Sequence, residues 1–175
     1  LIADEPRLMP HLHLSLQAGD DMILKRMKRR HLRGDILSVC EQARALRPDI
    51  VFGADVIAGF PTETEEMFSN TLNIIKECEL TFLHIFPYSE RPGTPAARMP
   101  QVPKDARKAR AARLREEGAR QVEKFLKNQI NKESQIIVEK ENFGRTEHFA
   151  EVSLDRSLPQ GSLHRVRITG LNNGR

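Results

Sequence analysis

Cysteine is scarce in this 175-residue sequence, which contains only Cys40 and Cys78. The two cysteines form no CxxC pair and have no other spacing typical of metal ligands, so we expect reduced thiols. No apolar run approaches the roughly 18 residues that a membrane-spanning helix needs, and we expect no membrane association. A secretory signal pattern is also missing. These absences together favour a cytoplasmic protein.

The charged residues leave the chain mildly basic, with a formal net charge of +4 and a pI of about 9.3. A basic balance favours a polyanionic partner, although many basic proteins bind no nucleic acid. Hydrophobic residues make up 39% of the sequence, which is enough for a packed core. The length suits one medium domain or slightly more.

The stretch IVFGADVIAGFPTETE, residues 50–65, predicts a buried strand, a tight turn and the start of a helix. β-branched and apolar residues dominate its first half, and Asp55 is the one charge there. Gly59 and Pro61 then break the strand. Ligands of βα folds gather at the C-terminal ends of the strands. We therefore expect Asp55 and residues 58–62 to lie at a ligand-binding edge.

Hydrophobic periodicity predicts alternating strands and helices between residues 11 and 88. Strands are expected at 11–17, 50–57 and 81–88, and helices at 20–30, 35–46 and 63–78. Thr62 and Glu65 have the spacing of a capping box, so the third helix should begin beside them. This order of elements implies a parallel sheet with right-handed crossovers.

Polar side chains interrupt each predicted strand, on one face only. They are His11, His13, Ser15, Gln17, Asp55 and His84. Strands of a doubly wound sheet are usually apolar on both faces, so a polar face suggests a barrel with a polar lumen. Three strands cannot close a barrel. The region is therefore either a small open sheet or one half of a barrel.

The C-terminal part predicts a basic helix over residues 104–131, followed by an all-β domain from residue 134. Strands are expected at 135–140, 146–154 and 162–169, with Gly144 and Gly161 at the turns between them. Asn173-Gly174 is a hairpin-turn signal at the very end of the sequence. We therefore expect the sequence to be cut inside a hairpin, and to lack an N-terminal half as well.

Four stretches in order resemble the radical S-adenosylmethionine (SAM) tRNA methylthiotransferases and cover nearly the whole chain. They are HLHLSLQAGDDMILKRMKRRH, GADVIAGFPTETEEMF, LHIFPYSERPGTPAARM and FGRTEHFAEV. The first three are similar to segments of the family's barrel. The fourth resembles the opening of the TRAM domain, a small RNA-binding β-barrel. The stretch LSLQAGDD is most similar to the corresponding sequence in the branch of the family that methylthiolates N6-threonylcarbamoyladenosine beside the anticodon.

The resemblance implies an α/β fold: the C-terminal half of a radical SAM (βα) partial barrel in residues 1–133, then a truncated TRAM domain in 134–175. It also implies an enzyme that uses SAM and [4Fe-4S] clusters to modify tRNA. One cluster is held by a Cys-x3-Cys-x2-Cys motif, and this sequence contains none. We therefore expect the cluster ligands outside these residues, no catalytic residue within them, and a fragment that is inactive alone.

The family's SAM site implies a set of positioning residues at the predicted strand ends. The set is Ser15, Gln17, Asp55, Ala58, Gly59, Phe86 and Pro87. Gly59 lets the backbone approach a ligand closely, and Phe86 offers a ring for stacking. Alternative roles for these residues are hydrogen bonds between strands, a histidine or arginine partner for Asp55, an ordinary turn, and core packing.

Basic residues of the β-domain are the predicted RNA contacts: Lys140, Arg145, Arg165 and Arg167. Phe143 or Phe149 would stack on bases, or else fill the small barrel core. Two further basic sets, residues 25–33 and the helix after Pro103, are either phosphate contacts or solvated helix faces.

The histidines His11, His13 and His84 predict no metal site, because no Asp or Glu motif completes a ligand set. Two alternatives to the enzyme stay open. One is an RNA-binding module without catalysis, and the other is a metal-dependent barrel hydrolase using His13, Asp55 and His84. The oligomeric state is open, and an exposed sheet edge predicts poor solubility of the isolated chain.

Overall fold

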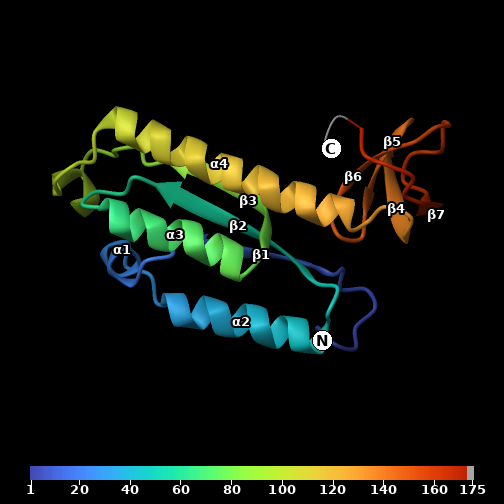
Figure 1. The fold of residues 1–175 in the computed structure, drawn as a ribbon, viewed down its shortest axis with the longest axis horizontal. Helices are drawn as coiled ribbons and strands as arrows, with labels where there is room; N and C mark the ends of the chain where they lie inside the picture. The colour runs from blue at the N-terminus through green and yellow to red at the C-terminus, as the bar shows by residue number, and fades with distance from the viewer. Residues whose placement is uncertain (173–175) are drawn as a thin grey trace.

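A computed structural model describes residues 1–172, which form two sheets and four α-helices (Figure 1). The first sheet is parallel, in the order β1-β2-β3, with β1 at His11–Gln17, β2 at Val51–Ala58 and β3 at Leu80–Pro87. The mixed α/β order and the parallel sheet were both predicted, and the structure confirms them.

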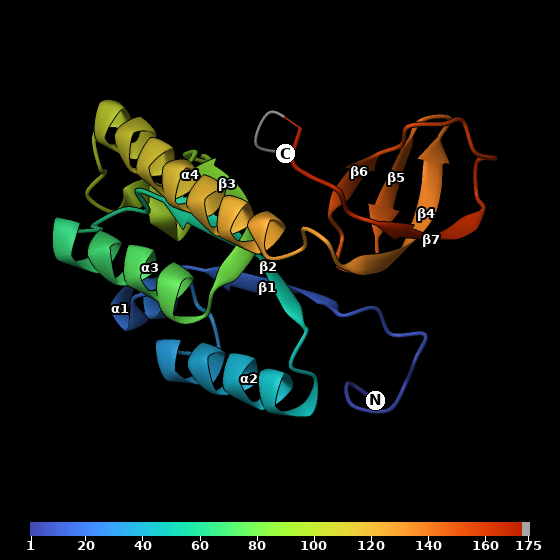
Figure 2. The same ribbon diagram turned by 45° about the vertical axis from the view of Figure 1, so that its right-hand side comes forward.

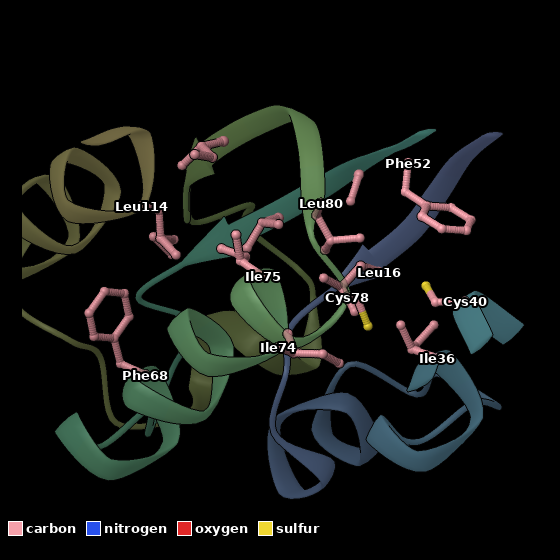
Figure 3. Packing of buried hydrophobic residues seen from close by; sticks show 14 of the residues in the cluster. Leu16, Ile36, Cys40, Phe52, Phe68, Ile74, Ile75, Cys78, Leu80 and Leu114 are labelled. Carbon is pink, nitrogen blue, oxygen red and sulfur yellow. The ribbon is translucent and has the colours of Figure 1, made fainter. Parts of the chain in front are cut away.

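Helices α2 (Arg33–Leu46), α3 (Glu65–Glu77) and α4 (Lys104–Lys127) share one hydrophobic core with the parallel sheet. The core combines strand residues such as Phe52 with helix residues such as Phe68 and Leu114 (Figure 3). Alternate strand residues point to opposite faces. The polar residues of the three strands therefore lie on the face away from this core.

Helix α1 (Asp21–Arg26) is shorter than its predicted span of residues 20–30. Asp20 caps its N-terminus by accepting hydrogen bonds from the backbone N–H groups of Met22 and Ile23. The helix ends at Arg26 with Met27 as its C-cap, and Lys28 adopts a φ of 58°. Left-handed backbone cannot continue a right-handed helix, so the basic residues that follow lie in a loop.

The predicted cap of α3 is wrong by two residues. Thr64, not Thr62, is the N-cap, and its hydroxyl accepts from the Met67 N–H at 3.2 Å. Thr62 instead lies in a turn at φ 68°, where its N–H donates to the Pro100 carbonyl. A long-range backbone contact therefore overrides the local capping pattern.

The second sheet is antiparallel, in the order β6-β5-β4-β7 (Figure 2). Its strands are β4 (Glu133–Lys140), β5 (Phe143–Thr146), β6 (Glu151–Ser153) and β7 (Leu163–Arg167). The predicted strand at 146–154 is divided by a turn in which Phe149 has a φ of 71°. Helix α4 ends at residue 127 rather than 131, and a 3-10 turn (Pro95–Arg98) lies in the proline-rich loop.

Gly161 lies in a turn at φ 79°, as predicted, but Gly144 does not. Gly144 lies within β5, paired with Val138 and Val152. A Cβ at this glycine would lie 2.7 Å from the Ile137 carbonyl oxygen, so the absence of a side chain permits the close strand approach. The predicted hairpin at Asn173-Gly174 lies outside the described residues.

The two sheets meet through the turn between β5 and β6. The Phe149 ring stacks on His11 at 5.0 Å between centroids and meets Phe82 edge-on at 5.9 Å. His148 Nε2 lies 3.3 Å from a carboxylate oxygen of Asp49. These contacts cover the N-terminal ends of the parallel strands and leave the C-terminal ends open.

Candidate functional site

A cavity of about 500 Å³ opens at the C-terminal ends of the three parallel strands. Four of the seven predicted SAM-side residues line it: Gln17, Asp55, Phe86 and Pro87. Strand register explains their convergence, because Ile57 pairs with Phe86 and Ala58 with Pro87. The predicted ligand-binding edge therefore coincides with a concave site.

Gln17 and Phe86 have the features expected of ligand contacts. Gln17 has a φ of 69° at an irregularity in the pairing of β1 with β2, and it is buried. Left-handed backbone is costly for a residue other than glycine, and such strain gathers at functional sites. Phe86 is 52% exposed, so one large apolar ring faces the cavity without a protein partner covering it.

The other predicted SAM-side residues lie beside the cavity rather than in its lining. Ser15 is exposed on the polar face of β1, whereas Ala58 is fully buried in the core. Gly59 has a φ of 73°, and a Cβ there would lie 2.6 Å from Arg107 Cγ. Glycine is therefore required at this turn by the packing of α4, whatever its role toward a ligand.

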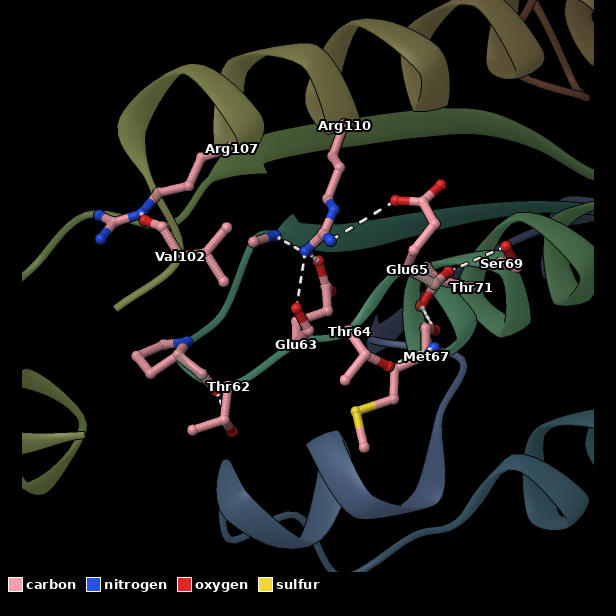
Figure 4. Close-up of polar contacts among 12 residues, drawn as sticks. Thr62, Glu63, Thr64, Glu65, Met67, Ser69, Thr71, Val102, Arg107 and Arg110 are labelled. Atoms are coloured by element: carbon pink, nitrogen blue, oxygen red, sulfur yellow. Dashed lines mark hydrogen bonds and ion pairs between the residues drawn. The ribbon is translucent and has the colours of Figure 1, made fainter. Parts of the chain in front are cut away.

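Glu63 and Arg110 hold the turn after β2 in place (Figure 4). The Gly59 N–H donates to Glu63 Oε2 at 2.9 Å, and Arg110 donates to the same oxygen at 2.8 Å. Burial raises the pKa of the Glu63 carboxyl, and the charge of Arg110 opposes that shift. No local sequence pattern indicates this pair, because its members are 47 residues apart.

Arg107 is the second buried cation of α4, with only 5% of its surface exposed. Its guanidinium donates to the carbonyls of Val102 and Tyr88, and to the side chains of Glu90 and Gln101. Arg107 thus fixes the loop after β3 against the helix. The sequence predicts it as part of a basic helix, because helical spacing does not show which arginines are buried.

A row of three polar side chains crosses the sheet beside the cavity. His13 Nε2 lies 3.0 Å and His84 Nδ1 lies 3.2 Å from the same oxygen, Asp55 Oδ1. Strand register aligns Asp55 with His84. The histidine partner considered for Asp55 is therefore present twice. The signal in the sequence was the polar position shared by three adjacent strands, but their register could not be read from it.

Carboxylate partners divide the basic residues into two kinds. On α4, Arg110 pairs with Glu63, Arg113 with Glu65, Arg120 with Glu116, Lys124 with Glu79, and Lys127 with Glu123. In the predicted basic set of residues 25–33, Arg33 pairs with Glu77 at 2.6 Å. Five others have no carboxylate within 4 Å among residues 1–172, two at the end of α1 and three in the loop after it: Lys25, Arg26, Lys28, Arg29 and Arg30. The helix is thus largely neutralised, whereas the loop is not.

The predicted RNA contacts of the second sheet are divided in the same way. Arg145 pairs with Glu139 at 3.0 Å and lies over the Phe149 ring, and Arg167 pairs with Glu133 at 3.3 Å. Lys140 and Arg165 are exposed and have no carboxylate within 4 Å in the part of the chain that the structure describes.

The two cysteines do not provide a cluster site. Cys40 and Cys78 are both buried in the apolar core of the parallel sheet (Figure 3). A hydrogen bond to Cys78 and burial raise the pKa of the Cys40 thiol, so it remains protonated. An iron–sulfur cluster needs thiolate ligands, and residues 1–172 offer only these two thiols. A [4Fe-4S] cluster therefore does not fit within them.

Comparisons with known proteins agree with the geometry. Residues 1–75 match the Radical SAM superfamily. The chain is 53% identical over 174 residues to the threonylcarbamoyladenosine tRNA methylthiotransferase MtaB of Rickettsia prowazekii, covering 99% of this chain and 41% of that protein. It is 40% identical over 172 residues to a tRNA-2-methylthio-N(6)-dimethylallyladenosine synthase of Cereibacter sphaeroides, covering 94% of this chain and 39% of that protein.

A similar synthase from Ruegeria pomeroyi is 39% identical over 169 residues. The chain spans about two fifths of the length of these relatives. None of the described helices is long and apolar enough to cross a membrane. The similarity over nearly the whole chain confirms the resemblance to the radical SAM tRNA methylthiotransferases that the four sequence stretches predicted.

Proposed function

We propose that this chain is the SAM- and RNA-facing part of a cytoplasmic enzyme that adds a methylthio group to N6-threonylcarbamoyladenosine in tRNA. The observation that carries the proposal is the 53% identity to a threonylcarbamoyladenosine tRNA methylthiotransferase over 99% of the chain. The relatives named for dimethylallyladenosine are less similar, at 40% and 39% identity. This difference favours the threonylcarbamoyl substrate.

The cavity at the strand ends fits the adenosine portion of SAM. Phe86 supplies an exposed ring for the purine, and Gln17 supplies a carboxamide that can both donate and accept hydrogen bonds. Pro87, Asp55, Ser15, Ala58 and Gly59 complete the proposed SAM side. In the whole enzyme, SAM would supply both the radical chemistry and the methyl group. The residues of this chain position and shield the ligand, and the cluster ligands lie outside them.

We further propose that residues 134–175 are a TRAM domain and that residues 1–133 belong to the SAM barrel. Lys140 and Arg165 are free to contact phosphate, whereas Arg145 and Arg167 would have to leave their glutamates. The basic residues between 25 and 30, which have no carboxylate partner among residues 1–172, follow β1 in the sequence and add further positive charge. Contacts of this kind make RNA binding depend on salt.

The test is an assay of the whole enzyme, reconstituted with iron and sulfide and given reductant, SAM and unmodified substrate tRNA. Mass spectrometry of the digested nucleosides should detect the 2-methylthio form. Phe86→Ala should raise the KM for SAM about tenfold, as expected for the loss of one stacking contact. The control Val39→Ala removes an exposed apolar side chain of α2 and should leave the KM unchanged.

An enzyme that contains its full complement of clusters but forms no methylthio nucleoside would refute the proposed activity. Formation of the product with an unchanged KM in Phe86→Ala would refute only the SAM-site assignment. The two parts of the proposal are therefore tested separately.

For the 175-residue chain by itself, RNA binding without catalysis is the function that its residues support. The supporting observation is that the cysteines among residues 1–172 cannot hold a cluster. This chain should bind tRNA with an affinity that falls as salt rises, and Gln17→Ala should leave that affinity unchanged. Loss of tRNA binding in Lys140→Glu combined with Arg165→Glu would locate the interface on the second sheet.

A further inference from the structure

Asp55 is the one charged residue on the central strand β2, and it has no lysine or arginine within ion-pair distance in residues 1–172. Two thirds of its side chain is buried. A largely buried carboxylate is normally paired with a cation or coordinates a metal. The two groups that do contact it, His13 and His84, are themselves the commonest kind of metal ligand.

The three donor atoms are arranged as the ligands of a small divalent ion would be. Each adjacent strand contributes one of them: His13 Nε2, Asp55 Oδ1 and His84 Nδ1 all lie within 4.8 Å of one another. Zinc bonds of about 2.0–2.2 Å in tetrahedral geometry place neighbouring donors roughly 3.3 Å apart. The observed separations from Asp55 Oδ1, 3.0 and 3.2 Å, are close to that value.

The strand beneath the row leaves room for this arrangement. A Cβ at Gly53 would lie 2.6 Å from His13 Nδ1, so only glycine lets the imidazole lie across β2 and direct Nε2 at Asp55. On the opposite side the row is open, since the side chains of His13 and His84 are 34% and 60% exposed. Water could therefore complete the coordination.

We propose that His13, Asp55 and His84 bind a divalent transition-metal ion of the zinc class, with water in the remaining positions. Two imidazoles and one carboxylate with open positions form the ligand set of catalytic zinc and non-haem iron sites. The sequence predicts no metal site for the histidines, and it places His13, Asp55 and His84 together only in the alternative of a metal-dependent hydrolase. Asp55 provides that carboxylate from a strand 29 and 42 residues away from the two histidines.

The experiment uses the 175-residue chain, stripped with a chelator and then titrated with Co²⁺. We expect one equivalent to bind, with the visible d–d absorption of a low-coordinate site, and Zn²⁺ should displace it. Asp55→Asn and His84→Gln should each weaken Co²⁺ binding at least about tenfold. The matched control His164→Gln removes a histidine of β7 and should bind as the original chain does.

Circular dichroism melting shows whether each variant is folded. If the variants unfold, NMR of the imidazole nitrogens in the unsubstituted chain tests the site instead. Zn²⁺ should shift the resonances of His13 and His84 alone. Strong thiolate charge-transfer absorption would assign the ion to Cys40 and Cys78 and overturn the proposal. A spectrum that remains that of aqueous Co²⁺ would also overturn the proposal. A His84→Gln variant that binds Co²⁺ as tightly as the unsubstituted chain would overturn it as well. The row would then be a hydrogen-bonded cluster without metal.

Discussion

The two sheets of this protein differ most in how they are stabilised. The parallel sheet buries large side chains such as Phe52 and Phe68 against three helices. The antiparallel sheet buries few apolar residues within residues 133–167, chiefly Ile136, Val138 and Ala150. It also exposes Ile137 and Leu163, as well as Phe149 at the contact between the sheets. A core this small gives little independent stability, so the second sheet depends on its contact with the first.

The two ends of the parallel strands also differ, because the second sheet covers only one of them. At the N-terminal end, His11 and Phe82 are covered by Phe149 of the second sheet. At the C-terminal end, Gln17 and Phe86 line an open cavity. One end therefore serves stability and the other is available to ligands.

The largest expected effect is on the core of the parallel sheet. Phe52→Ala should lower the free energy of unfolding by about 3–5 kcal/mol, because the side chain is fully buried and leaves a cavity. Denaturant unfolding followed by circular dichroism measures the change. Val39→Ala, at an exposed position of α2, should stay within about 0.5 kcal/mol. A loss for Phe52→Ala no larger than that of the control would show that this core does not stabilise the fold.

A smaller effect is expected at the contact between the sheets. Phe149→Ala should cost about 1 kcal/mol, the worth of the aromatic contacts with His11 and Phe82. Calorimetry should then show the second sheet melting before the first. The control Leu163→Ala removes an exposed side chain of β7 and should leave one transition. If Phe149→Ala also melts in one unchanged transition, the sheets do not depend on each other in this way.

Acid should weaken the same contact through His11. Burial, and then the nearby charges of His13 and His148, lower the pKa of the His11 imidazole below 6.5. The folded state therefore favours the neutral ring, and this stabilisation is present above pH 6.5 and lost as the pH falls below it. The melting temperature should drop between about pH 7.5 and about pH 5.5, and His11→Gln should reduce that drop. An equal drop in the variant would contradict the assignment.

The smallest effect concerns the surface between α3 and α4. A hydrogen bond from Arg113 lowers the pKa of the Glu65 carboxyl below 4.5, so the pair stabilises the protein above that pH and less as the pH falls. Glu65→Gln should cost about 0.5 kcal/mol near neutral pH, and the cost should shrink as the pH falls below 4.5. Glu66→Gln changes an adjacent exposed glutamate of α3 and is the matched control. A cost that persists in acid would exclude the ion pair as its cause.

Much of the fold could be predicted because local patterns encode it. The three parallel strands lie within one residue of their predicted bounds, since alternation and buried runs mark them. Thr62 and Gly144 were misassigned for a common reason. Their positions are set by contacts with Pro100 and with β4, which lie elsewhere in the sequence.

The sequence predicted individual residues of the candidate site but not the contacts between them. Gln17 and Phe86 were found because they end predicted strands. The row of His13, Asp55 and His84 depends on the register between strands, and the burial of Arg107 depends on a loop that folds back on α4. The sequence named the three residues of the row as one alternative site, but their contact could not be derived from spacing along one element, and neither could the burial of Arg107.

The most direct test of the central claim is mass spectrometry of tRNA nucleosides from a strain that lacks the gene for this protein. We expect the 2-methylthio form of N6-threonylcarbamoyladenosine to disappear and its unmethylthiolated precursor to accumulate. Reintroducing the gene should restore the modified nucleoside. An unchanged level of this nucleoside, or a loss of the dimethylallyl relative instead, would contradict the proposed function.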